Sequence, residues 1–398
     1  MKPQAPPVPS APGSRKVAWA TAILFLGFCA GVPLVQAVRE VVVQKRAPLV
    51  TDLFRKFPSK ASLHGWDAAQ RDNSWLAERI REPLLQWRWD LFHDAGAKAI
   101  PGVGDWLFYA PDVQYLARPD ARDARLLQGG SFDTLFKGRH VFLNDPKVAI
   151  LDFRDQLRAR GIELVLVPVP TKASIHPDLL NPSIRQPAPS PTLKLIEDLR
   201  ASRLTVVDLF APMLAARGRA LYLRQDTHWE PAGLAVAAPA IAGTVRRFLG
   251  ERKASSPWAL KDTAIARWGD IAEMSKLPDR RKIWQEQRLV VPRVVDATGH
   301  GYRDADTARI LWLGDSYSRI YQTDAPGSAG VISRVAQLLG EPMKSIVNDG
   351  GASTKVREQL ARRPEMLEGV KVVVWEFVER DIRFGDGGWR PVEIPKTH

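Results

Sequence analysis

Ser316 is the main candidate in this chain for a residue that takes part in covalent chemistry. It ends the tripeptide Gly314-Asp315-Ser316, directly after the apolar run 310–313. A serine hydroxyl becomes a nucleophile when a neighbouring imidazole takes its proton. Gly314 permits a tight turn that would lift Ser316 above a sheet edge, with its backbone N–H facing a developing oxyanion. The same tripeptide also suits a plain turn that caps a helix. The motif alone therefore makes Ser316 a candidate nucleophile and does not establish that role.

A carboxylate and an imidazole stand two positions apart in Asp226-Thr227-His228-Trp229. In an extended segment, alternate side chains point to the same side, so Asp226 could hold one ring nitrogen of His228 while the other faces a nucleophile. A lone histidine is more often structural, but a carboxylate at this spacing favours function. Ser316, His228 and Asp226 therefore predict a triad for acyl transfer.

A metal centre is the alternative chemistry for this pattern, because Asp-x-His followed by Gly-Asp also opens the motif set of binuclear metallophosphoesterases. Those enzymes need a Gly-Asn-His and further histidines downstream. Only His300 and His398 follow, and neither comes after an asparagine. The one cysteine, Cys29, excludes an intrachain disulfide and a cysteine-based metal site. We therefore predict no metal and no cofactor.

The composition indicates the domain organisation and limits the kinds of partner that the protein could bind. The chain has 398 residues, 25% of them charged, and thirteen tryptophans, which indicates one large α/β domain with a smaller appended region. The formal charge of +13 could suit an anionic partner, but Lys and Arg are spread along the chain without a basic run. Because zinc-finger, Walker A and Rossmann spacings are also lacking, we predict no nucleic-acid partner.

The N-terminal region predicts a membrane anchor. Residues 17–38 carry no charge and are long enough to span a bilayer as a helix, after a Pro-rich, disordered cytoplasmic leader at 1–16. Val35-Gln36-Ala37 resembles a cleavage site, so a cleaved signal peptide is the alternative. We expect an amphipathic helical stalk or collar at 39–100 and the catalytic domain at 101–398. A short leader before one helix favours a catalytic domain in the periplasm if the source is bacterial.

Beyond residue 140, helical patterns alternate with short apolar runs, which predicts a mostly parallel sheet with helices on both faces. The expected strands are 163–168, 204–209, 309–313, 344–348 and 370–375, and the expected helices are 148–160, 192–202, 231–249, 329–339 and 354–363. Ligands bind at the carboxyl ends of such strands, where the loops carry the residues considered above. The polar stretch 251–307 fits neither pattern and could be an insertion.

These motifs together resemble the AlgJ/AlgX family of polysaccharide O-acetyltransferases, whose catalytic domain is SGNH-hydrolase-like. The resemblance covers roughly residues 100–385 and includes Gly-Asp-Trp-Leu-Phe-Tyr at 104–109, Pro-x-Pro-Thr-Lys at 168–172 and Trp-Glu-Phe-Val-Glu-Arg at 375–380. In ordinary SGNH hydrolases the serine block comes first, whereas here the Asp/His block precedes Ser316. This permuted order is what the resemblance predicts.

The resemblance implies roles and partners. Ser316 would be the nucleophile, His228 the general base and Asp226 its orienting carboxylate. Gly350 and Gly351 stand at a plausible position for the glycine of the oxyanion hole, but Glu376 stands where ordinary SGNH hydrolases would have an asparagine. Arg319, Lys172 and Arg380 are candidate contacts for an acidic, alginate-type polymer. A membrane-bound, multi-span acyltransferase would donate acetyl to an exported polysaccharide. An acetyl esterase and a non-catalytic relay or scaffold are the alternative functions.

Overall fold

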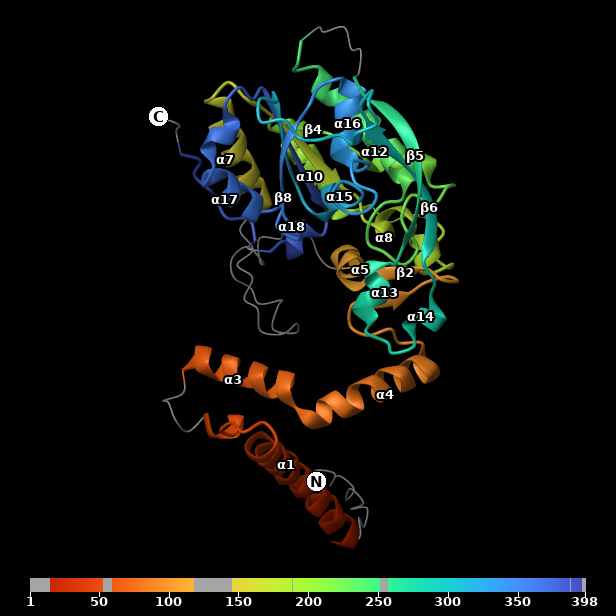
Figure 1. Ribbon diagram of the computed structural model, residues 1–398, viewed down its shortest axis with the longest axis vertical. Coiled ribbons are helices and arrows are strands. Elements are labelled where there is room, and N and C mark those ends of the chain that lie inside the picture. Colours follow the sequence, from red (N-terminus) through yellow and green to blue (C-terminus); the bar gives the residue numbers. More distant parts are fainter. Residues whose placement is uncertain are drawn as a thin grey trace, which may run out of the picture. The chain divides into compact units, whose positions relative to one another are not determined.

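The computed structural model describes residues 15–52, 59–117, 145–187, 189–250, 257–386 and 388–395 (Figure 1). The chain divides into two compact units, Met1–Trp87 and Arg88–His398, here called the N-terminal and C-terminal units. Most of the predicted leader lies outside the described residues.

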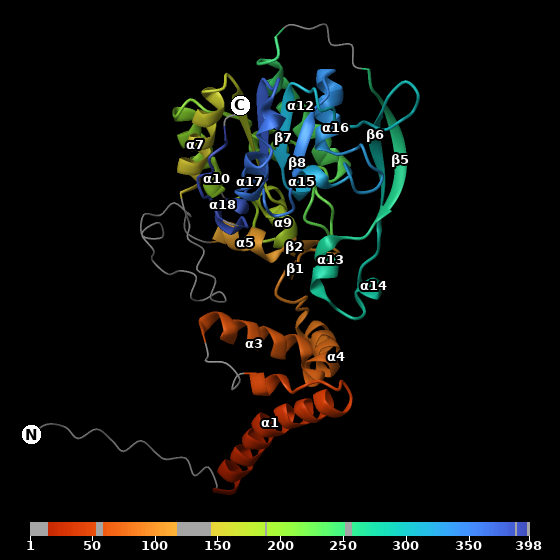
Figure 2. The ribbon, with the colours of Figure 1, turned by 60° about the vertical axis from the view of Figure 1, so that its left-hand side comes forward.

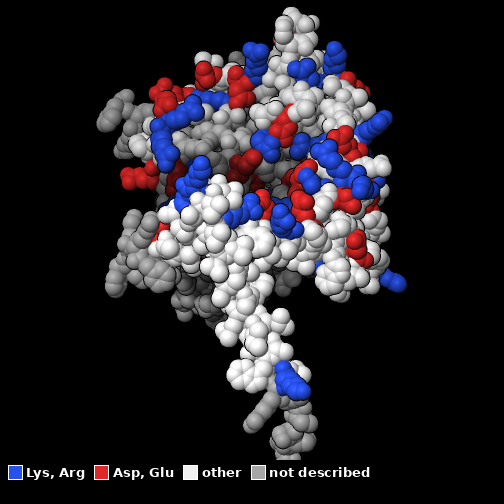
Figure 3. Space-filling model, turned by 60° about the horizontal axis from the view of Figure 1, so that its bottom comes forward, with Lys and Arg blue, Asp and Glu red and all other residues white. Residues whose placement is uncertain are grey.

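The N-terminal unit is helical. It holds α1 (Arg15–Val42), η1 (Leu49–Thr51), α3 (Lys60–Asn73) and the larger part of α4 (Trp75–Phe92). Within α1, Lys16–Val42 is long and apolar enough to cross a membrane. Figure 3 shows the projecting part of this helix as white, uncharged side chains with a basic side chain near its far end. The apolar helix predicted from the sequence is thus present, and its apolar side chains are exposed.

The C-terminal unit is built on a parallel sheet of five strands in the order β4-β3-β9-β7-β8. These strands are β3 (Glu163–Val169), β4 (Thr205–Val206), β7 (Ile310–Gly314), β8 (Lys344–Val347) and β9 (Val372–Val378). All seven residues of β9 are buried, because helices cover both faces of the sheet. The predicted fold class is therefore confirmed.

The two faces of the sheet bury two separate apolar clusters, and alternate strand residues belong to different clusters. Val372 and Val374 face the cluster under α12 (Pro231–Arg246) and α16 (Val331–Leu339). Val373 and Trp375 face the cluster under α7 (Pro146–Arg158), α10 (Pro191–Ala201) and α17 (Lys355–Ala361). Figure 2 shows the strands between these two helical layers.

Short elements complete the C-terminal unit, most of them around the carboxyl ends of the strands. They are β1 (Ala99–Pro101), β2 (Leu107–Tyr109), α5 (Ala110–Ala117), α8 (Lys172–Ile175), α9 (Pro177–Leu180), α11 (Phe210–Ala216), α15 (Ser316–Arg319), η3 (Pro364–Leu367) and α18 (Asp381–Phe384). β1 and β2 form an antiparallel pair joined by a turn.

The stretch that the sequence left unassigned is a long antiparallel hairpin outside the main sheet. β5 (Ala259–Arg267) pairs with β6 (Gln287–Val295) along nine positions of each strand. Between them lie α13 (Asp270–Ser275) and α14 (Arg280–Ile283). The hairpin brings Arg267 and Asp270 to the Asp226/His228 segment, as described below.

The carboxylate of Glu379, fully buried just after β9, ties the carboxyl ends of two strands to neighbouring helices. It accepts hydrogen bonds from the Thr171 N–H at 2.7 Å and the Thr192 hydroxyl at 2.9 Å. The hydroxyls of Thr171, Ser174 and Ser190 also donate to it. One side chain therefore satisfies donors from α8 and from the start of α10.

We expect Glu379→Ala to lower the free energy of unfolding by about 3 kcal/mol or more, because several buried donors lose their acceptor together. Urea unfolding of the full chain in detergent, followed by tryptophan fluorescence, measures this change. Glu358→Ala is the control, because Glu358 pairs with Arg390 at 2.9 Å near the surface and should change stability by less than about 1 kcal/mol. Equal losses in the two variants would contradict the expectation.

Candidate active site

Asp315 positions the turn Gly314-Asp315-Ser316, here called the nucleophile turn after the proposed role of Ser316. The side chain of Asp315 is buried. One carboxylate oxygen of Asp315 accepts the N–H of Tyr317 at 2.8 Å and so caps α15. The other accepts the N–H of Val378 at 2.9 Å, which joins the end of β7 to the end of β9. Ser316 itself is partly exposed at the start of α15. The structure thus places Ser316 at the carboxyl edge of the sheet, as predicted.

Gly314 is required there for space rather than for an unusual backbone conformation. A Cβ atom at Gly314 would lie 2.2 Å from the Ser318 hydroxyl oxygen and 2.8 Å from a carboxylate oxygen of Glu376. Ser318 accepts the indole N–H of Trp312 at 2.7 Å and contacts Glu376, so this cluster fills the space beneath the turn. Burial raises the pKa of Glu376 well above its usual value, and the Asp315 charge raises it further. Glu376 is therefore a neutral, structural carboxyl inside β9.

His228 and Asp226 lie in a loop pinned at both ends. Tyr222 and Trp229 form an antiparallel bridge, and the Leu223 N–H donates to the His228 carbonyl at 3.0 Å. Within the loop, Nδ1 of His228 is 2.6 Å from Oδ1 of Asp226. Nε2 of His228 is buried and has no hydrogen-bond partner among the described residues. The predicted pair is thus formed, with its second ring nitrogen unused.

Tyr317 brings this loop and the nucleophile turn together, although they are 90 positions apart in the chain. Its hydroxyl donates to the Thr227 carbonyl at 2.6 Å. Its ring lies 5.0 Å from the His228 ring and meets Trp229 edge-on at 5.2 Å. Because Tyr317 directly follows Ser316, these contacts join the turn that bears Ser316 to the loop that bears His228.

Two residues of the site come from the hairpin region and were missed in the sequence. Nε of Arg267 donates to Oδ2 of Asp226 at 3.1 Å. Asp270 accepts the Thr227 N–H and hydroxyl, both at 2.7 Å. The one signal in the sequence was a glycine, Gly269, beside these residues. The structure explains it, because a Cβ atom there would lie 2.1 Å from the Gln225 carbonyl oxygen. A glycine between an Arg and an Asp is too common to predict a site.

The charges around His228 favour its protonated form. Burial lowers the pKa of His228, but the Asp226 charge and hydrogen bond outweigh burial, with help from Asp270, and raise the pKa above its ordinary value. Burial would raise the pKa of Asp226, but His228 and Arg267 hold it far below its usual value. Asp226 is therefore ionised and stabilises an imidazolium, as a general base requires.

Asp226, His228 and Asp270 also lie close enough to one another to hold a metal ion, with one donor atom each within 4.8 Å. The Arg267 guanidinium already neutralises Asp226, and Nδ1 of His228 is committed to the same carboxylate. A divalent ion would have to displace these contacts. The donor set therefore fits a hydrogen-bonded triad better than a metal centre.

If His228 acts as the base, we expect Arg267→Gln to move the acid limb of the kcat/KM profile to higher pH, because Arg267 lowers the pKa of His228. At neutral pH less of the enzyme then carries the neutral base, so the rate falls. Arg267→Lys keeps the positive charge and should move the limb less. Rates between pH 5 and 9 measure this, and a downward shift of the limb in Arg267→Gln would contradict it.

Lys172 does not reach the surface as a substrate contact would. Its ammonium is buried and donates to the Leu107 carbonyl at 2.7 Å and the Arg224 carbonyl at 3.0 Å. It also lies 5.5 Å from the ring centre of Trp106. Burial lowers the pKa of Lys172 to about 7, against the charges of Asp226 and Asp270. The structure gives Lys172 the task of joining β2 to the segment before Asp226.

The other predicted contacts differ in their surroundings. Gly351 donates its N–H to the Asn348 carbonyl at 3.0 Å, so that N–H is not available to an oxyanion. Gly350 is an exposed turn residue with φ of +65°. Arg319 lies on α15 between Asp349, at 2.9 Å, and Asp324. The N–H of Gly351 thus already has an acceptor, Arg319 lies on the same short helix as Ser316, and Gly350 follows the segment that bonds Gly314 through the Asn348 N–H.

Arg380 lies close to the nucleophile turn as well. It pairs with the buried Asp112 at 2.9 Å, and its guanidinium lies 5.9 Å from the ring centre of Tyr317 and 5.2 Å from that of Tyr109. Burial raises the pKa of Asp112 to about 6, in spite of the nearby Arg380. Arg380 thus packs against Tyr317, the residue that follows Ser316.

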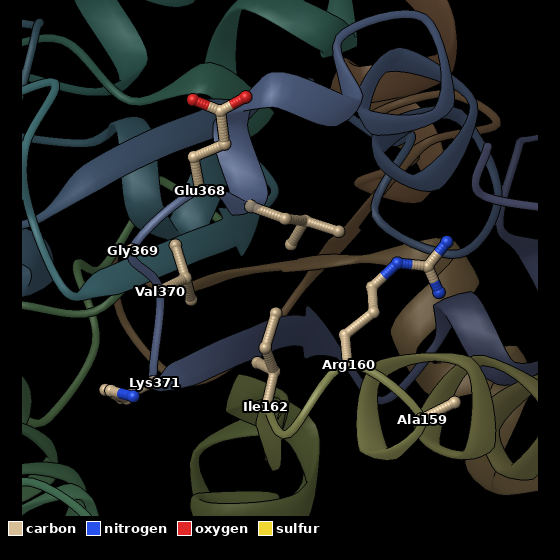
Figure 4. Close-up of a pocket in the computed structure, with 8 residues that line it drawn as sticks. Ala159, Arg160, Ile162, Glu368, Gly369, Val370 and Lys371 are labelled. Carbon is tan, nitrogen blue, oxygen red and sulfur yellow. The ribbon is translucent and has the colours of Figure 1, made fainter. Parts of the chain in front are cut away.

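A surface hollow of about 490 Å³ lies at the opposite, amino-terminal edge of the sheet (Figure 4). It is lined by residues just before β3 and β9, among them Arg160, Ile162 and Lys371. The Arg160 guanidinium donates to the carbonyls of Gln156 at 2.7 Å and Ile394 at 2.5 Å. This hollow is therefore separate from the candidate active site.

Comparisons with known proteins identify relatives of this chain. A Pseudomonas putida protein named probable alginate O-acetylase AlgJ is 31% identical over 315 residues, which are 73% of this chain and 71% of that protein. A Pseudomonas fluorescens protein of the same name is 28% identical over 244 residues, 57% of this chain and 59% of its own length. This chain thus spans less than two thirds of that second relative.

The fold and the family model point the same way. The solved O-acetyltransferase domain of Pseudomonas putida AlgJ superposes with a TM-score of 0.54 at 23% identity, over 71% of this chain and 91% of that domain, which shows a shared fold. Residues 140–379 match the family model described as SGNH hydrolase-like domain, acetyltransferase AlgX. Because that match spans more than half of the chain and confirms the predicted resemblance, the chain belongs to the AlgX family of SGNH hydrolase-like acetyltransferases.

Proposed function

We propose that this chain moves acetyl groups to hydroxyls of an exported polysaccharide through an acetyl-Ser316 intermediate. His228 is the general base and Asp226 orients it. One observation carries the proposal: Nδ1 of His228 is 2.6 Å from Asp226, while its buried Nε2 has no hydrogen-bond partner within the part of the chain that the structure describes, and Tyr317 joins this loop to the turn that bears Ser316. This is the arrangement that a serine nucleophile needs.

In the first half-reaction, Ser316 Oγ attacks the carbonyl carbon of the acetyl donor and its proton passes to Nε2 of His228. The ion pair with Asp226 stabilises the imidazolium that results. The tetrahedral intermediate collapses, the bond to the donor's leaving group breaks, and His228 returns the proton to that group. Acetyl-Ser316 and neutral His228 remain.

In the second half-reaction, His228 takes the proton of a sugar hydroxyl, whose oxygen attacks the acetyl carbonyl carbon. The ester bond to Ser316 breaks and Ser316 regains its proton from His228. The negative charge on the carbonyl oxygen needs donors in both steps. We assign one of them to the Ser316 N–H, since the first N–H groups of a helix lack intrahelical acceptors.

The substrate and setting extend the proposal. The relatives are named alginate O-acetylases, so a uronate polymer is the proposed acceptor. Arg380, packed on Tyr317, is the proposed contact for its carboxylates. α1 is proposed to anchor the chain, with the catalytic unit in the periplasm of a bacterium and a multi-span membrane acyltransferase as the acetyl donor. Figure 3 shows acidic and basic side chains interspersed on the face in view, without a patch of one sign.

Trapping the intermediate tests the serine assignment. The full chain is mixed with a chromogenic acetyl ester, quenched in acid, digested and examined by mass spectrometry. We expect the acetyl group on the peptide that contains Ser316. Acetate release at the full rate without acetyl-Ser316 would refute the proposed intermediate and revive a non-serine mechanism.

Adding acceptors separates transfer from hydrolysis. Oligomannuronate should gain acetyl and accelerate ester turnover, whereas a neutral oligosaccharide of equal length should do so less. If neither oligosaccharide is acetylated while acetate is released, the esterase alternative holds. If no ester turns over at all, a scaffold function is favoured.

A further inference from the structure

The first part of α4 carries an exposed apolar stripe that the proposed chemistry does not use. Ile80, Leu84 and Trp87 are 46%, 48% and 54% exposed. Their spacing of four and three places them on one face of the helix. Single exposed apolar residues are ordinary, but an aligned set on one helix face marks an interaction surface.

This stripe starts close to the end of the candidate membrane helix. Gln36 of α1 is buried and donates to the Asn73 carbonyl at 3.0 Å, and its side-chain oxygen accepts the N–H of Trp75 at 3.0 Å. Trp75 is the first residue of α4. Figures 1 and 2 both show α3 and α4 beside the C-terminal end of α1. The start of α4 is therefore fixed to the last turns of the apolar helix.

The polar residues of α1 indicate where it leaves the hydrocarbon. Arg39 and Glu40 are the first charged residues after Lys16. Glu40 is buried, pairs with Arg46 at 2.9 Å and accepts the Leu49 N–H at 2.7 Å. At 1.5 Å per residue, Ile80 lies only about 8 Å along α4 from Trp75. The interfacial layer of a bilayer is about 6 Å thick on each side, so the stripe can lie at that depth when α4 runs along the surface rather than away from it.

The flanking charges favour lipid as the occupant. At 100° per residue, Arg79 and Arg81 fall on the two sides of the stripe, and Glu78 and Glu82 fall on the opposite face. Arginines beside an apolar face can reach headgroups while their stems cover acyl chains. Tryptophan is enriched at the same depth.

We propose that the part of α4 up to Trp87 lies on the bilayer surface, with Ile80, Leu84 and Trp87 in the boundary between headgroups and acyl chains. This inference rests on α1 as the membrane anchor, and is independent of the triad. It gives the chain a second membrane contact beside the spanning helix.

The single cysteine makes a direct test possible. The full chain is reconstituted in nanodiscs and spin-labelled at Cys29, which lies exposed in α1. In a Cys29→Ser background, Ile80→Cys and Leu84→Cys report on the stripe, and Glu78→Cys and Glu82→Cys are matched controls on the opposite face. Collision rates with oxygen, which concentrates in lipid, and with a water-soluble nickel chelate are measured by electron paramagnetic resonance.

Labels at positions 29, 80 and 84 are expected to collide with oxygen several-fold more than with the nickel chelate, and labels at 78 and 82 to show the reverse preference. If 80 and 84 match 78 and 82 while 29 stays in lipid, the stripe faces water and the inference fails. Protection of 80 and 84 from both reagents means a protein contact, which also overturns it. A water-exposed label at 29 would refute the anchor itself.

Discussion

Ser316→Ala is expected to lower kcat/KM for acetyl transfer by a factor on the order of 10⁶, because the proposed nucleophile, base and orienting carboxylate would act as one unit. The fold should survive the change. Ser316 is partly exposed, and its hydroxyl makes no recorded hydrogen bond within the described ranges. Thermal unfolding and the acetyl-ester assay, run on the same preparation, check both statements. The acetylated peptide should disappear together with the activity.

Ser318→Ala is the matched control two residues along α15. Ser318 is buried and accepts the Trp312 indole N–H at 2.7 Å, so its loss should cost about 1 to 3 kcal/mol of stability. The acetyl group should nevertheless still appear on Ser316. If Ser318→Ala abolished the acetyl adduct and Ser316→Ala kept it, the wrong serine would have been assigned.

The parallel strands could be predicted because strands buried on both faces are continuous apolar runs. The ends of the strands were less predictable. The prediction ended the last strand at residue 375, before Glu376, but β9 continues to Val378, since burial and Asp315 keep Glu376 neutral. β4 is shorter than predicted, with only Thr205–Val206 paired at the sheet edge.

The hairpin of β5 and β6 escaped prediction because β5 is largely exposed and has little apolar alternation to read. Arg267 was not predicted as a site residue for the same reason, because its contact with Asp226 depends on the tertiary position of the hairpin. Lys172 illustrates the opposite error. A lysine in a polar loop suggests a surface contact, but only the fold reveals the two carbonyls that hold it inside.

Asp226→Asn is expected to lower kcat/KM by about 10⁴-fold, because an amide can hold His228 in the tautomer that cannot accept the serine proton. The shape of the site should persist. Asparagine keeps an oxygen for Arg267, which lies 3.1 Å from Asp226, and for the Asp270 N–H at 3.3 Å. The loss should appear mainly in kcat, with the unfolding temperature little changed.

The pH dependence of the activity should also change in Asp226→Asn, in a direction that follows from the pKa of His228. Burial lowers the pKa of His228, and Asp226 is the main group that raises it above the ordinary imidazole value. The base works only when neutral, so wild-type activity should rise as pH increases through that raised pKa. Without the Asp226 charge the pKa of His228 falls, and the acid limb of the residual activity should move to lower pH.

Arg267→Gln should move the same limb the other way, because it removes a positive charge from beside the same carboxylate. Opposite shifts from two neighbours of one imidazole would identify His228 as the group that titrates, whereas parallel shifts would assign the limb to another residue.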